Sequence, residues 1–250
     1  MFDLLQSDPA RFFDIALYRV PAVLIALILH ECAHAYVAYR LGDPTAKELG
    51  RLTLNPARHL DIMGTILMIF AGFGWAKPVP IDPRNFKNPR RDDLLVSVAG
   101  VTVNLALFIA LSILCVWIDR ALWDERVFEQ STAMERLMFD GNILPYIMFG
   151  YADELSDWML RPWLIPALRI CAQLAMVNLY IAVFNLLPVP PLDGSHVLND
   201  LILRRDLFAS RLTASVGSVA LLILSFSGLL GRAIGWLAGG VQRGLLMIIA

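Results

Sequence analysis

Residues 20–39 read VPAVLIALILHECAHAYVAY, and Glu31 is the only residue in this run that carries a formal charge at neutral pH. A helix needs roughly 20 predominantly apolar residues to cross a lipid bilayer. Three further stretches, 94–118, 170–192 and 212–231, contain no charged residue at all. The sequence therefore predicts an all-α polytopic membrane protein with four clear spans, the last of them an additional C-terminal span.

The composition of the whole chain supports residence in a lipid bilayer. Hydrophobic residues make up 58% of the chain, charged residues 17%, and the mean hydropathy is +0.62. A net charge of -1 without a basic cluster gives little attraction for phosphate groups, so nucleic acid is excluded as a partner. The three cysteines lie in apolar runs without a CxxC pair, which predicts neither a disulfide framework nor a thiolate metal site. We expect one membrane domain over residues 1–250, with its core at about 20–200.

Two shorter apolar stretches leave the number of spans open between four and six. Residues 62–76 run into Pro78, Pro80 and Pro83, which interrupt both helices and central strands, so we expect a re-entrant segment. Residues 141–152 are shorter still and precede an acidic stretch, which favours an interfacial helix over a crossing.

Charges in the connecting segments predict the orientation, because cytoplasmic loops of membrane proteins are enriched in Lys and Arg. Residues 40–93 carry nine basic side chains, on both sides of the short apolar piece, and the segment 193–211 again carries Arg204, Arg205 and Arg211. Residues 119–169 contain more acids than bases. We expect 40–93 and 193–211 on the cytoplasmic side and 119–169 on the other.

The pair His30 and His34 is the strongest chemical signal in the chain. Residues four apart lie on one face of a helix, so both imidazoles can reach one metal ion, and zinc accepts nitrogen ligands at about 2.0–2.1 Å. Glu31 stays beside such an ion and can act as the general base that takes a proton from zinc-activated water. The alternative is a chance cluster, but ionisable residues inside a membrane cost ~2.5–3.5 kcal/mol on the translocon scale and are usually functional.

A catalytic zinc ion normally has three protein ligands and one open position, so a third ligand is needed. Asp193 is the best candidate, because it follows the uncharged stretch 170–192, whose prolines force the helix end into extended backbone. His34 lies six residues before Arg40, or about 9 Å along a helix, so both parts of the site fall near the cytoplasmic face. The alternative for Asp193 is an ordinary helix-ending aspartate in a Pro-Leu-Asp-Gly turn.

These residues resemble the site-2 protease family of intramembrane zinc metalloproteases, also classified as peptidase M50. The resemblance rests on HECAH at 30–34, on Gly100 and Asn104 in a second span, and on NLLPVPPLDG at 185–194. Together these segments cover most of residues 20–200. The resemblance implies a three-helix catalytic core.

The resemblance also implies the roles of individual residues. One zinc ion per chain is held by His30, His34 and Asp193, and Glu31 is the base. Asn185 lies near the site, where its amide can steady the oxyanion or the substrate backbone. Substrates are transmembrane proteins, cut within or next to their membrane-spanning helices.

Four further polar residues have alternative interpretations. Asn185 can instead satisfy a neighbouring helix, and for Asn104 we favour a polar contact between packed helices. His59 belongs to a polar loop and is expected to be hydrogen-bonded, not a metal ligand. His196 is near Asp193 in sequence, but a structural role on the solvent side is favoured.

Residues 50–56, GRLTLNP, with His59 and Asp61, resemble the short branch of the family. Many members carry a PDZ or CBS domain, and no segment here is long and polar enough to form one. We therefore expect a multi-pass protein of a bacterial or archaeal cell membrane whose substrate recognition depends on the membrane core and its loops. The segment 62–80 is a candidate edge to which an unwound substrate adds as a strand.

Two other function classes compete with a protease. A membrane metal-ion transporter also places His, Asp and Asn along its spans, but it predicts acidic or His ligands on several helices and an inverted repeat, which the sequence lacks. A catalytically silent membrane scaffold normally loses the base or a ligand, whereas Glu31 and the three candidate ligands are all present here.

Overall fold

The computed structural model describes residues 2–70, 75–123, 147–148, 150–151, 157, 159–203 and 211–249. Within these ranges the regular structure is helical, and the only bridges between extended segments are two isolated pairs, Leu60 with Ala76 and Trp123 with Met159. The predicted all-α class is therefore confirmed for the part of the chain that is described.

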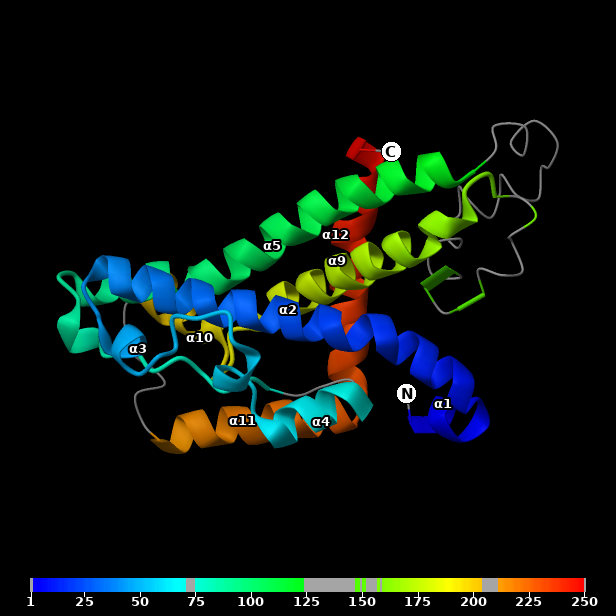
Figure 1. Ribbon diagram of the computed structural model, residues 1–250. Helices are drawn as coiled ribbons and strands as arrows, with labels where there is room; N and C mark the ends of the chain where they lie inside the picture. Colours follow the sequence, from blue (N-terminus) through cyan, green and yellow to red (C-terminus); the bar gives the residue numbers. More distant parts are fainter. Residues whose placement is uncertain are drawn as a thin grey trace.

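Three long helices form the centre of the molecule: α2 (Pro9–Leu41), α5 (Pro89–Leu122) and α9 (Ile165–Asn185). Each is long and apolar enough to cross a membrane, the third together with a preceding 3-10 turn that begins at Pro162. They pack against one another along their length (Figure 1). The predicted spans 20–39 and 94–118 lie inside α2 and α5, so both predictions are confirmed.

Small residues allow these helices to approach closely. Ala22 and Ala26 of α2 are fully buried and pack in one cluster with Val177 of α9. Helices in a membrane gain little from the hydrophobic effect between them, so such contacts depend on close van der Waals packing. The ends of α2 are determined by local contacts. At the start, the Asp8 side chain accepts a hydrogen bond from the Arg11 amide, and Gly42 ends the helix with a φ of 110°.

The third predicted span, 170–192, is wrong at its end, because α9 stops at Asn185. The next seven residues contain Pro188, Pro190 and Pro191, none of which can donate a helical hydrogen bond. The chain then forms a short helix, α10 (Asp193–Val197). A Cβ atom on Gly194 would lie 2.4 Å from the Leu186 carbonyl oxygen, so a glycine is needed for this turn to fold back on the helix end.

The fourth predicted span, 212–231, is also wrong as a single straight helix. The chain forms α11 (Arg211–Phe226) and α12 (Leu229–Ile249), which meet at an angle of 82°. Gly228 has a φ of 72° and ends the first helix in the left-handed region. If the bent pair counts as one span, the described residues contain up to four spans.

Helix α12 was not predicted, because Arg232 and Arg243 interrupt its apolar sequence. It crosses the three central helices instead of running along them (Figure 1). Its Ala238 is fully buried in a cluster with Phe108 of α5 and Leu179 of α9.

The candidate re-entrant segment begins with α4 (Ile62–Phe70), and the structure describes it again from Trp75. Its two ends meet, because Leu60 pairs with Ala76 and the Lys77 amide donates to the His59 carbonyl at 2.8 Å. The segment thus returns to the place from which it left, as a re-entrant segment must. The predicted interfacial helix at 141–152 lies mostly outside the described residues.

Candidate metal centre

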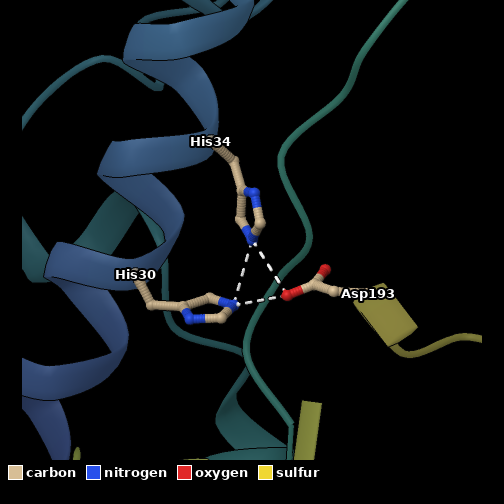
Figure 2. A group of neighbouring side chains, drawn as sticks. All are labelled: His30, His34 and Asp193. Atoms are coloured by element: carbon tan, nitrogen blue, oxygen red, sulfur yellow. Dashed lines mark hydrogen bonds and ion pairs between the residues drawn. The ribbon is translucent and has the colours of Figure 1, made fainter. Parts of the chain in front are cut away.

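His30, His34 and Asp193 come together at the meeting point of α2 and α10, as Figure 2 shows. The Nε2 atoms of the two histidines are 3.0 Å apart. Asp193 Oδ2 lies 3.2 Å from His30 Nε2 and 3.4 Å from His34 Nε2. The structure thus brings together the three residues that the sequence suggested as ligands, from positions more than 150 residues apart.

The outer nitrogens of both imidazoles are already engaged. His30 Nδ1 lies 2.6 Å from Asn104 Oδ1, and His34 Nδ1 lies 2.7 Å from the Val96 carbonyl oxygen. Both partners are oxygen acceptors, so each Nδ1 carries the proton and donates it. In the neutral imidazoles the lone pairs are therefore on the Nε2 atoms, which face Asp193.

The orientation of Asn104 is fixed by a second amide. Asn178 of α9 donates to the Leu174 carbonyl at 2.8 Å, so its Oδ1 is free to accept. It accepts from Asn104 Nδ2 at 2.6 Å, which leaves Asn104 Oδ1 for His30. Both asparagines are fully buried. The chain of amides therefore determines which nitrogen of His30 points into the site.

These two roles were not predicted from the sequence. For Asn104 the prediction was a contact between packed helices, which is true of its bond to Asn178 but omits His30, and no role was predicted for Asn178. An uncharged amide within an apolar span was the available signal, but the sequence did not reveal which helix faces which.

The three inward atoms fit a divalent cation. They are the Nε2 atoms of the two imidazoles, each with a lone pair, and a carboxylate oxygen of Asp193. This oxygen, Oδ2, is buried without a hydrogen-bond partner among the described residues. His30 is 3% and His34 6% exposed, so water does not screen this cluster of electron pairs. Two nitrogens and one oxygen, with a further position open, are a ligand set typical of catalytic zinc. The imidazoles would bind through Nε2 while their Nδ1 atoms hold their present partners.

Gly100 of α5 makes this packing possible. A Cβ atom at this position would lie 2.5 Å from His30 Cε1 and 2.5 Å from His34 Nε2. Non-bonded carbon and nitrogen atoms do not approach that closely, so only glycine lets α5 lie against the two rings.

Glu31 follows His30 on the same helix and is partly exposed. Its Oε2 accepts a hydrogen bond of 3.1 Å from the backbone amide of Val79, in the extended segment that follows the re-entrant turn. The candidate base is thus held between α2 and that segment.

Three other residues named from the sequence lie outside the cluster. Asn185 donates to the Ile181 carbonyl of its own helix at 3.0 Å, so its catalytic role stays a prediction. His59 is buried and donates to a carbonyl of its own loop, as expected of a residue that is not a ligand. His196 pairs with Asp93 at 2.9 Å, and this hydrogen bond raises the pKa of the His196 imidazole.

Comparison with known proteins places this site in context. Residues 18–226 match the model of "Peptidase family M50". The protein "Putative zinc metalloprotease YwhC" of Bacillus subtilis is 40% identical over 186 residues, which cover 74% of this chain and 69% of YwhC.

Two mycobacterial relatives are more distant. "Putative zinc metalloprotease Rip2" of Mycobacterium tuberculosis is 30% identical over 75% of this chain and 58% of its own length. The Rip2 protein of Mycolicibacterium smegmatis is 31% identical over 46% of this chain and 45% of its own length. The chain thus spans about half the length of these two relatives. No solved structure matches significantly.

Proposed function

The chain belongs to peptidase family M50, and on this basis we propose that it is an intramembrane zinc metalloprotease. Its substrates would be membrane proteins, cut at peptide bonds within or next to their transmembrane segments. One zinc ion per chain would be held by His30, His34 and Asp193.

The observation that carries this proposal is a set of three inward electron-pair donors, two of them on a helix apolar enough to span a membrane and the third on α10 beside it. Two of the donors have their tautomer fixed by buried partners, and the third is a carboxylate oxygen without a donor. Because burial of such groups is costly unless a cation compensates them, the cluster favours a metal over a purely structural role.

The reaction would divide between the metal and one side chain. A bound zinc ion lowers the pKa of water and polarises the scissile carbonyl. Glu31 would take the proton of the attacking water and pass it to the nitrogen of the leaving amine. With their Nδ1 protons held by Asn104 and the Val96 carbonyl, His30 and His34 would present the Nε2 lone pairs to the ion.

Both the substrate backbone and water would have to reach the candidate metal site. A peptide bond within an intact helix has its carbonyl hydrogen-bonded, so the substrate must unwind locally before attack. Water would enter from the cytoplasmic face, since His34 lies only six residues, or about 9 Å, before Arg40 at the end of α2.

Replacing the base while keeping the ligands tests this proposal. Glu31→Gln should retain bound zinc and the melting temperature but reduce turnover by at least about 100-fold, the lower end of what general base catalysis contributes. Zinc is measured on purified protein, and uncut substrates are sought by comparing the membrane proteomes of cells with either form. Undiminished turnover in this variant would sink the protease assignment.

A ligand variant tests the metal site separately. Asp193→Ala removes one of three ligands and should lower the zinc content of the purified protein, whereas Asn185→Ala should leave it unchanged. Equal zinc content in wild type and Asp193→Ala would remove Asp193 from the ligand set.

A further inference from the structure

Glu31 depends on a backbone amide for its position. Its carboxylate is on α2, whereas the donor, the Val79 N–H, belongs to the extended segment after the re-entrant turn. A partly exposed glutamate on a helix has several rotamers of similar energy. The bond of 3.1 Å to Val79 selects one of them, but only while the segment itself is fixed.

Arg51 fixes that segment. Its guanidinium is buried, with 6% of the residue exposed, and Nη2 donates to two successive carbonyls, those of Lys77 and Pro78. Val79 is the next residue. Burial lowers the pKa of Arg51, and the negative charge of Glu31 opposes that shift.

The loop that carries Arg51 is itself anchored. His59 is fully buried; its ring donates to the Thr53 carbonyl at 2.7 Å, and its own carbonyl accepts the Lys77 amide at 2.8 Å. The segment is thus held from the loop by a backbone bond at Lys77 and by the guanidinium at Lys77 and Pro78. A substrate strand would find the amides of this stretch already bonded, because Pro78 has no N–H and those of Lys77 and Val79 have partners.

We propose that Arg51 is a positioning residue for the peptidase reaction: by holding the Lys77 and Pro78 carbonyls it keeps the Val79 amide on Glu31 and the Glu31 carboxylate beside the metal centre. The proposal rests on the proposed function. Arg51 acts through the backbone and does not contact the candidate ligands in the described structure. Its guanidinium is suited to this role because it donates to two acceptors in a fixed geometry, which a lysine cannot reproduce.

The first test measures turnover and zinc in Arg51 variants. Arg51→Gln and Arg51→Lys should lower kcat about 10–100-fold, as expected of a misplaced catalytic group, with KM and zinc content nearly unchanged. Arg58→Gln is the matched control, since Arg58 is an exposed arginine of the same loop. An unchanged or increased kcat in the Arg51 variants would overturn the proposal.

A second pair of variants acts on the amide itself. Val79→Pro removes the N–H that Glu31 accepts, whereas Val79→Ala keeps it. The first should lower kcat as much as Arg51→Gln does, and the double variant Arg51→Gln/Val79→Pro should be no slower than either single one, because both break one chain of contacts. Fully additive losses would assign Arg51 an unrelated structural role.

Hydrogen exchange gives a readout that needs no activity. In the purified protein, Arg51→Gln should speed exchange of the Val79 amide, and Arg58→Gln should not. Unchanged exchange of the Val79 amide in Arg51→Gln would overturn the positioning role of Arg51 and leave the proposed function untouched. A second outcome separates the two proposals. If the Val79 amide exchanges as expected in wild type and in Arg51→Gln, but wild type cleaves no more membrane substrate than Glu31→Gln does, the proposed function fails and the contact is a structural one.

Discussion

At the scale of single residues, the site is defined by where protons reside. His30 has two ring nitrogens, and its role depends on the outer one keeping the proton. That choice is made by Asn104, whose own orientation follows from Asn178 and the Leu174 carbonyl. Asn178 does not contact His30, yet through Asn104 it determines which nitrogen of His30 faces the candidate metal site.

Asn178 is therefore expected to affect metal binding without being a ligand. Asn178→Leu leaves Asn104 free to rotate its amide, so the Nδ1–H of His30 loses its fixed acceptor. Loss of such an outer partner lowers metal affinity about 10–100-fold. Competition with a chelator on purified protein measures the zinc dissociation constant.

The matched control for this experiment is Asn185→Leu on the same helix. Its amide bonds to the Ile181 carbonyl of α9, so zinc affinity should stay at the wild-type value. If both variants bind zinc equally well, the amide chain does not orient His30.

At the scale of helices, the metal centre depends on how closely α5 approaches α2. The rings of His30 and His34 lie directly against Gly100, and the carbonyl of Val96 one turn earlier holds His34. The helix α5 thus leaves room for the rings at Gly100 and provides a backbone acceptor at Val96. Its distance from α2 determines whether the rings can face Asp193.

Gly100→Ala should disturb this arrangement through one methyl group. Its Cβ would lie 2.5 Å from atoms of both rings, so the helices must separate or the rings must turn. Overpacking of this kind costs about 1–3 kcal/mol. We expect less bound zinc and a lower melting temperature, measured on the purified protein.

Gly235→Ala provides the comparison, because an added Cβ on Gly235 of α12 meets no atom within 4 Å. Alanine also favours a helix by about 1 kcal/mol over glycine. Zinc content and melting temperature should therefore be kept or improved. A Gly100→Ala protein that behaves like Gly235→Ala would contradict the close-approach argument.

At the scale of the whole molecule, the re-entrant segment decides which loops share a side of the membrane. The meeting of Leu60 with Ala76 returns the chain to its starting point. We therefore expect the basic residues of 40–93 on one side, which the positive-inside rule predicts to be the cytoplasm. The bend between α11 and α12 turns the chain so that α12 crosses the central helices and packs against α5 and α9 (Figure 1).

Cysteine labelling tests this topology. In a background without the native cysteines, Ala57→Cys and Lys87→Cys should react with an impermeant thiol reagent only from the cytoplasmic side, although α4 lies between them. Trp163→Cys, which is exposed at the other end of the bundle, should react only from the opposite side. Labelling of positions 57 and 87 from different sides would show that residues 62–76 cross the membrane. The background replaces Cys32, Cys115 and Cys171 by alanine.

Sequence alone predicted the features that depend on local spacing. Two histidines four residues apart share a helix face, and an uncharged run of sufficient length predicts a span, although the ends of the spans 170–192 and 212–231 were not predicted correctly. These follow from helix geometry and from the cost of charge in a membrane, which neighbouring residues already determine.

Only the tertiary structure decided the rest, because those features depend on contacts between residues far apart in the chain. Asn104 lies 74 residues from His30 in the sequence, and its bond exists only once α2 and α5 are packed. The contact of Glu31 with Val79 likewise requires the re-entrant turn to return, and the direction of α12 follows from one glycine at φ 72° and from packing against α9. Spacing along one helix identified His30 and His34 as candidate ligands, whereas the orientation of their rings and the contact of Glu31 depend on which backbones lie against that helix.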